Sequence, residues 1–274
     1  MSSIFPLNSL YNQPRTECLR YLIQNERGSK ILLFSVHSTI FATIVITRVF
    51  MKSILYHGSP NIIEVPQIGK GNPNNDYGLG FYCTENLELA KEWASSSATD
   101  GFANEYALNW KGLTVCDLSK GHNILNWMAV LVENRTFDLT NAVAESAREY
   151  LLENFLPEYK EADIVRGYRA DDSYFTFAKD FLNNSIPLET LSEAMRLGKL
   201  GEQIVLRSQK AFDALSFKQA HRTDSSIYYP KKASRDSRAR EEYQEIRRKF
   251  DPAKATFMID IIRNKWTNDD ERLQ

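Results

Sequence analysis

The sequence predicts an α+β domain, because short segments rich in aromatic and β-branched residues alternate irregularly with segments of helical periodicity. The expected strands are apolar and bounded by turn residues: residues 54–59, 80–84, 105–110, 113–118, 163–168 and 202–207. The expected helices have apolar residues three or four positions apart, or clear end signals: residues 85–94, 124–132, 142–155, 173–182, 187–197 and 231–249. Lys111 and Gly112 predict a hairpin between two strands, and Thr84 is the expected N-cap of the first helix.

Composition narrows the possible functions. The chain has 274 residues, 43% of them hydrophobic, which is enough for a globular core. A formal net charge of −1 does not predict a nucleic-acid partner. Cys18, Cys83 and Cys116 are widely spaced and odd in number, so they predict neither a disulfide framework nor a zinc site. The four His residues show no metal-ligand spacing, and we expect no metal.

The chain divides into three parts by composition. Residues 1–50 differ from the rest, and their apolar run at 31–50 has the length of a membrane span. A signal peptide, a membrane anchor and a dispensable extension are the alternatives; the abrupt change at Met51 favours a dispensable extension and a cytoplasmic protein. Residues 51–220 are the expected folded domain, and residues 221–274 a charged helical tail that lies in solvent.

Two short motifs carry most of the chemistry: Tyr-His-Gly-Ser at 56–59 and Gly-Leu-Gly-Phe-Tyr-Cys-Thr at 78–84. A Gly after a His lets the main chain approach a planar ligand, because no Cβ intervenes. The His57 ring can donate to or accept from a hydroxyl, and the Tyr82 ring offers a flat stacking face. Together they predict a pocket for a ligand with a planar end.

The motifs resemble the nicotinamide pocket of ADP-ribosyltransferases of the diphtheria-toxin and poly(ADP-ribose) polymerase type. Four ordered segments, 56–59, 78–84, 167–175 and 201–206, resemble a bacterial family of unknown function assigned to that fold. The resemblance implies a split β-sandwich with surrounding helices and NAD as a substrate. It also implies a protein or nucleic-acid acceptor and, for many small bacterial members, a role as a toxin or phage-defence effector beside a small antitoxin protein.

The resemblance also assigns residues. His57 matches the first catalytic position and Tyr82 the second, while Gly58, Ser59, Gly80 and Arg169 are the expected NAD-binding residues. Arg169 could pair with the pyrophosphate and Asp171 orient an acceptor. The structural alternative, which we favour, has Arg169 paired with Asp171 and Asp172 capping a helix.

The third catalytic position falls on the strand that begins at Glu202. Alternation points Glu202 and Gln203 to opposite faces, and the more apolar face of Ile204 and Leu206 is shared by Glu202. This pattern favours Gln203 in the cleft, whereas a carboxylate would better stabilise a cationic ribose. We expect Gln203 and keep Glu202 as the alternative. A Gln here also leaves open a second function, a non-catalytic module that binds NAD or ADP-ribose.

Overall fold

The computed structural model describes residues 19–24, 30–35, 52–139, 141–170, 172–197 and 201–273. The chain forms two compact units, Met1–Val49 and Phe50–Gln274. In the first, β1 (Leu19–Gln24) pairs antiparallel with β2 (Lys30–Ser35). Of the apolar run at 31–50, residues 36–50 lie outside the described residues, so the expected extension or anchor stays a prediction. Among the described residues, no helix has both the length and the apolar character needed to cross a bilayer.

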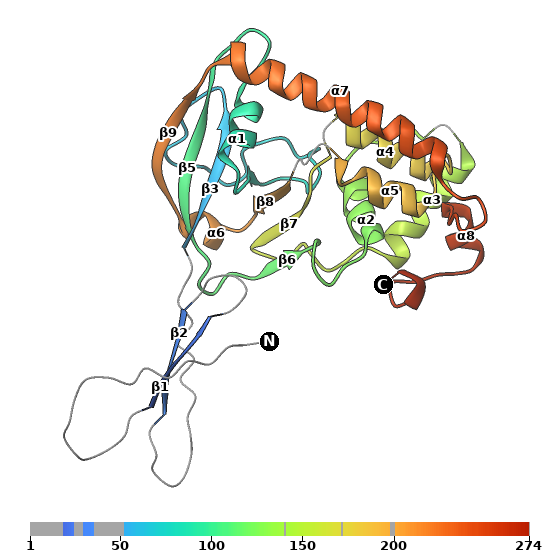
Figure 1. The fold of residues 1–274 in the computed structure, drawn as a ribbon, viewed down its shortest axis with the longest axis horizontal. Coiled ribbons are helices and arrows are strands. Elements are labelled where there is room, and N and C mark those ends of the chain that lie inside the picture. Colours follow the sequence, from blue (N-terminus) through green and yellow to red (C-terminus); the bar gives the residue numbers. More distant parts are fainter. Residues whose placement is uncertain are drawn as a thin grey trace, which may run out of the picture. The chain divides into compact units, whose positions relative to one another are not determined.

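The larger unit is a mixed α+β fold, as predicted, with two sheets (Figure 1). One has the order β3-β5-β9 and is antiparallel: β3 (Lys52–Ser59), β5 (Gly101–Asn109) and β9 (Leu215–Thr223). The other has the order β4-β8-β7-β6: β4 (Phe81–Cys83), β8 (Glu202–Leu206), β7 (Ile164–Tyr168) and β6 (Val115–Asp117). Its β6–β7 pair is parallel and its other pairs are antiparallel.

The two sheets touch along one edge and share a core. Backbone hydrogen bonds of 2.8 and 2.9 Å join Tyr56 to Thr84, so the strands that carry the two motifs lie next to each other. Alternate residues of both sheets fill the space between them: Leu55, Tyr106 and Leu108 from one, and Phe81, Cys83, Ile164, Ile204 and Leu206 from the other. The sheets therefore pack face to face over this cluster.

Helices cover the opposite face of the four-stranded sheet, where Val165 and Val205 belong to a second, larger core. That helical layer comprises α2 (Ile124–Asn134), α3 (Ala142–Asn154), α4 (Asp172–Leu182), α5 (Leu188–Ala194) and α8 (Met258–Arg263) (Figure 1). Short α1 (Leu87–Ala94) packs on β3 and β5, α6 (Gln209–Asp213) precedes β9, and a 3-10 turn, η2 (Glu271–Leu273), lies near the C-terminus. Both faces of the four-stranded sheet are thus buried.

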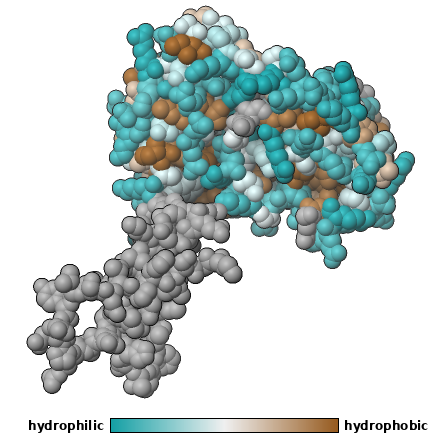
Figure 2. Space-filling view, viewed as in Figure 1, coloured by the Kyte–Doolittle hydropathy of each residue, from teal (hydrophilic) through white to brown (hydrophobic). Residues whose placement is uncertain are grey.

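The long helix α7 (Ser225–Lys249) runs from the sheets to the helical layer (Figure 1). Every fourth residue along one stripe is buried, namely Arg235, Ala239 and Tyr243. The Tyr243 ring stacks on Phe177 at 3.9 Å between centroids, and its hydroxyl donates to Asp180 at 2.7 Å. Most of the visible face of the larger unit is hydrophilic (Figure 2). Residues 221–273 thus belong to the same compact unit as the sheets, with the charged side of α7 in solvent.

Three local expectations differ from the structure. The hairpin at Lys111-Gly112 is wrong: a turn forms there, but β5 and β6 lie in different sheets because β3 and β9 already occupy both edges of β5. Thr84 does not cap α1, because the helix begins only at Leu87: the Thr84 hydroxyl accepts from the N–H of Asn86 at 3.2 Å, and the side chain of Asn86 caps the helix. Strand β9 was not expected, because its exposed residues leave little apolar alternation.

Candidate functional site

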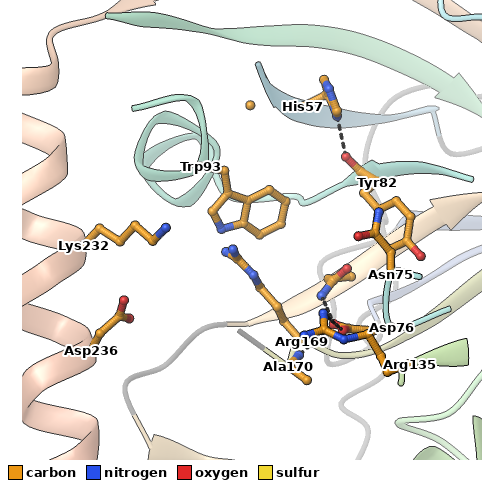
Figure 3. A pocket seen from close by; sticks show the side chains of 12 residues that line it. His57, Asn75, Asp76, Tyr82, Trp93, Arg135, Arg169, Ala170, Lys232 and Asp236 are labelled. Carbon is orange, nitrogen blue, oxygen red and sulfur yellow. Dashed lines mark hydrogen bonds and ion pairs between the residues drawn. The ribbon is translucent and has the colours of Figure 1, made fainter. Parts of the chain in front are cut away.

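The two motifs meet at a cavity of about 300 Å³ (Figure 3). Five of the eight residues predicted for the site line it: His57, Gly58, Tyr82, Arg169 and Gln203. Ser59, Gly80 and Glu202 are not among its lining residues. The lining comes from both sheets, from α1 and α7, from the C-cap of α2 and from two loops, so residues far apart in the sequence must fold together to form the cavity.

His57 is held in one orientation. Its Nδ1–H donates to the backbone carbonyl of Tyr82 at 2.7 Å, and its ring stacks on Phe81 at 4.3 Å between centroids. Burial lowers the pKa of the imidazole, although the bond to the carbonyl opposes this. A neutral ring with its proton on Nδ1 leaves Nε2 as a hydrogen-bond acceptor.

Tyr82 uses its hydroxyl for structure. The hydroxyl donates to the carbonyl of Gly78 at 2.6 Å and accepts from the N–H of Tyr77 at 3.1 Å. Gly78 has φ +72°, a backbone conformation that favours glycine and would be strained with any other residue. The hydrogen bond from Tyr82 therefore stabilises a turn that requires glycine at this position. Burial raises the pKa of the phenol. The ring is therefore the part of Tyr82 that remains for a ligand.

Three of the residues expected to bind NAD, namely Gly58, Ser59 and Gly80, have structural roles. A Cβ on Gly58 would lie 2.2 Å from the carbonyl oxygen of Ala90, so α1 could not pack on β3. A Cβ on Gly80 would lie 2.5 Å from Cγ1 of Val205. The Ser59 hydroxyl accepts from the N–H of Asn61 at 3.2 Å. Of the three, only Gly58 also lines the cavity.

The two candidates on β8 have different surroundings. Gln203 is 4% exposed, and its Nε2 donates to Oδ2 of Asp76 at 2.9 Å. Glu202 points to the other face of the strand, where it pairs with Arg166 of β7, which also pairs with Glu85 at 3.1 Å. Gln203 is the one at the cavity.

Asp76 is a cavity residue that the sequence analysis missed. It is 4% exposed and accepts from Nη1 of Arg135 at 3.1 Å and from the N–H of Ala170 at 2.8 Å. Burial raises the pKa of the carboxyl, and the bonds from Ala170 and Arg135 oppose that shift. The signal in the sequence is its position two residues before the glycine motif that begins at Gly78.

One wall of the cavity is rich in donors. The Arg169 guanidinium lies 4.3 Å from the centroid of the Trp93 ring, and Lys232 reaches the same region from α7 (Figure 3). The buried Nε1–H of Trp93 donates to no acceptor within the described residues. Asp236 of α7 also lines this wall. Nothing in the local sequence marks Trp93 or Lys232, because their role depends on how α1 and α7 pack.

Two further expectations concern the Asp171–Asp172 segment and metal binding. Asp171 and the side chain of Asp172 lie outside the described residues, so their pairing, capping and acceptor roles stay predictions. Within the described part of the chain, no group of three or more His, Cys, Asp and Glu side chains is arranged to hold a metal ion.

Comparison with known proteins places the chain in a protein family. No curated protein and no solved structure is significantly similar to the chain. A family described as "Protein of unknown function (DUF3990)" matches residues 53–217, which include both motifs and every cavity-lining residue except Lys232 and Asp236. Because the match covers more than half of the 274 residues, the chain belongs to this family of proteins of unknown function.

Proposed function

We propose that the cavity binds NAD and that the protein is an ADP-ribosyltransferase that modifies a macromolecular acceptor. One observation carries this proposal: His57, Gly58, Tyr82 and Gln203, which the resemblance to ADP-ribosyltransferases assigns to one pocket, line a single cavity. The two facing sheets joined at Tyr56 and Thr84 are consistent with the proposed split β-sandwich of that class.

We assign the lining residues to the successive parts of NAD, from the nicotinamide ring through the ribose to the pyrophosphate. The nicotinamide ring stacks on Tyr82, and its carboxamide bonds the backbone of Gly58. Because the pyridinium is cationic, stacking on an aromatic face contributes about 0.5–2 kcal/mol. Nε2 of His57 accepts from a ribose hydroxyl. The pyrophosphate lies toward Arg169 and Lys232, where two cations and an indole N–H outweigh the single carboxylate of Asp236 and favour an anion. A cavity of about 300 Å³ is at the small end for ligand sites, so the adenosine end extends outside it.

The proposed reaction begins with cleavage of the bond between C1′ of the ribose and the nicotinamide nitrogen. The electron pair leaves with nicotinamide, and positive charge develops on the ribose. A nucleophilic atom of the acceptor then bonds to C1′ and gives up its proton to solvent. In this proposal the amide dipole of Gln203 stabilises the charge on the ribose.

A second candidate is a module that binds NAD or ADP-ribose without catalysis. The observation that favours it is the amide at the third position: Gln203 lines the cavity, and Glu202 is paired with Arg166 on the other face. An amide dipole stabilises a developing cation less than a carboxylate does. In either case the toxin or phage-defence role, the small antitoxin partner and a cytoplasmic location are proposals that follow from the resemblance.

The test uses the full chain with NAD, following nicotinamide release by chromatography and NAD binding by calorimetry. We expect both. Gln203→Ala should lower turnover about 10²–10³-fold, the typical cost of losing one charge-stabilising group. Glu202→Gln is the matched control on the adjacent residue and should retain turnover. Binding without nicotinamide release would select the non-catalytic module, and absence of binding would contradict both functions.

A further inference from the structure

The strongest unassigned feature is the buried carboxylate beside Gln203. We propose that Asp76 is a positioning residue: it holds the Gln203 amide with its nitrogen turned inward, so that Oε1 is presented to the ribose as an acceptor. This inference rests on the proposed NAD site and deepens it.

The orientation follows from hydrogen-bond chemistry. An ionised carboxylate only accepts, so the amide end facing it must be the NH₂. Oδ2 of Asp76 accepts from Nε2 of Gln203 at 2.9 Å and from the Ala170 N–H at 2.8 Å. Oδ1 accepts from Arg135 at 3.1 Å. The guanidinium and the peptide N–H favour the ionised carboxylate at a site where burial opposes it.

The other end of the amide is then directed away from Asp76. Among the described residues, no donor bonds to Oε1 of Gln203, although the side chain is 4% exposed and lines the cavity. A free Gln side chain could offer either its N–H or its oxygen to a ligand. With the nitrogen fixed by Asp76, it offers oxygen, the atom type that a carboxylate would offer. Asp76 thus gives Gln203 the polarity that a cationic ribose needs.

The first experiment needs no substitution and no ligand. Neutron diffraction from crystals of the full chain locates deuterium on the amide. We expect two deuterons on the Gln203 atom that faces Asp76 and none on the carboxylate. An oxygen of Gln203 facing Asp76, or a deuteron on Asp76, would overturn the proposal whatever the protein does with NAD.

The second experiment removes the group that orients Gln203. Asp76→Ala should lower kcat for nicotinamide release about 10–100-fold, because the amide at 203 is no longer held, with a smaller change in KM. Gln203→Glu should also lower kcat, since two carboxylates would lie within hydrogen-bond distance. In the double variant Asp76→Ala/Gln203→Glu the carboxylate at 203 offers oxygen from either end and needs no positioning, so its kcat should exceed that of both single variants.

Asp163→Ala is the control, because Asp163 is also buried and accepts several hydrogen bonds but is not a lining residue of the cavity. A purely structural role for Asp76 predicts lower thermal stability in Asp76→Ala and Asp163→Ala alike and no recovery of kcat in the double variant. A double variant whose kcat does not exceed that of Asp76→Ala would overturn the proposal. If NAD binds without turnover, the same comparison is made with the dissociation constant. If NAD does not bind, the proposed function fails, and the neutron result alone decides the orientation of Gln203.

Discussion

Nδ1 of His57 lies 2.7 Å from the carbonyl oxygen of Tyr82, so a side chain of one sheet is bonded to the main chain of the other. The bond uses one ring nitrogen for structure and leaves the second for a ligand. It also ties the first two positions of the proposed NAD site together, because a displacement of β4 would turn the imidazole.

The first prediction concerns pH. Burial lowers the pKa of His57, so the ring stays neutral below its usual midpoint of about 6.5. NAD affinity should be constant from pH 8 to about 6.5 and fall only at lower pH, as Nε2 gains a proton and stops accepting. Below about pH 6.5, His57 is protonated more readily in the unfolded state than in the folded state. The free energy of unfolding therefore also falls as the solution is acidified through that range. Calorimetric titrations of wild type and His57→Ala measure this; affinity that rises on acidification would contradict the assigned tautomer.

The second prediction separates the ring of Tyr82 from its hydroxyl. Tyr82→Phe removes the bonds to Gly78 and Tyr77 and should cost about 1–3 kcal/mol of stability while NAD affinity changes little. Tyr82→Ala should in addition weaken NAD binding about 2- to 30-fold, the equivalent of the lost stacking. Urea unfolding and calorimetry give the two quantities, with exposed Tyr229→Phe as the control. Equal NAD affinities in the Phe and Ala variants would show that the ring does not contact the ligand.

The third prediction compares neighbouring lysines on α7. Lys232 lines the cavity, whereas Lys231 is directed to Glu88 and to the ring of Tyr228. Lys232→Ala should lower NAD affinity about tenfold and reduce its dependence on salt, because a charged bond to phosphate is lost. Lys231→Ala should bind NAD as the wild type does. Nicotinamide riboside, which has no phosphate, should bind equally to all three proteins; a loss of riboside affinity in Lys232→Ala would place Lys232 elsewhere than at the phosphate.

The fourth prediction concerns stability. Asp163 accepts from the Thr114 N–H at 2.8 Å and from the hydroxyls of Thr114 and Ser208, which lower the pKa of its carboxyl to about 2. Its contribution, on the order of 2 kcal/mol, is complete above about pH 4 and is lost as the pH falls toward 2. Asp163→Asn should therefore be less stable than wild type at pH 7, and the difference should shrink on acidification. Urea unfolding at several pH values tests this, with exposed Asp138→Asn as control; a difference that does not change with pH would mean that the charge of Asp163 has no role.

The sequence was sufficient for the fold class and for the segments near the motifs. His57, Gly58 and Tyr82 were identifiable because local patterns place them: a strand end, a close approach and an aromatic after a glycine turn. The choice between Glu202 and Gln203 was harder. The prediction of Gln203 rested on the assumption that only one face of β8 is buried. Ile204 and Val205 lie on opposite faces of the strand, and both are buried.

The remaining site residues depend on long-range packing. Lys232 reaches the cavity only because Ala239 and Tyr243, further along α7, anchor the helix in the helical core. Trp93 is placed by the contact of α1 with Gly58. Asp76 has no periodic pattern, and its importance comes from partners 59, 94 and 127 residues away in sequence, namely Arg135, Ala170 and Gln203.

The end of the family match inside β9 has a practical consequence. A protein cut after residue 217 would keep both motifs, yet it would divide the strand that ends at Thr223 and lose the whole of α7. The helical core would lose Tyr243, and the cavity would lose the wall that bears Lys232. The family match therefore covers less of the chain than the compact unit does, and membership in the family does not by itself imply the wall that α7 adds to the cavity.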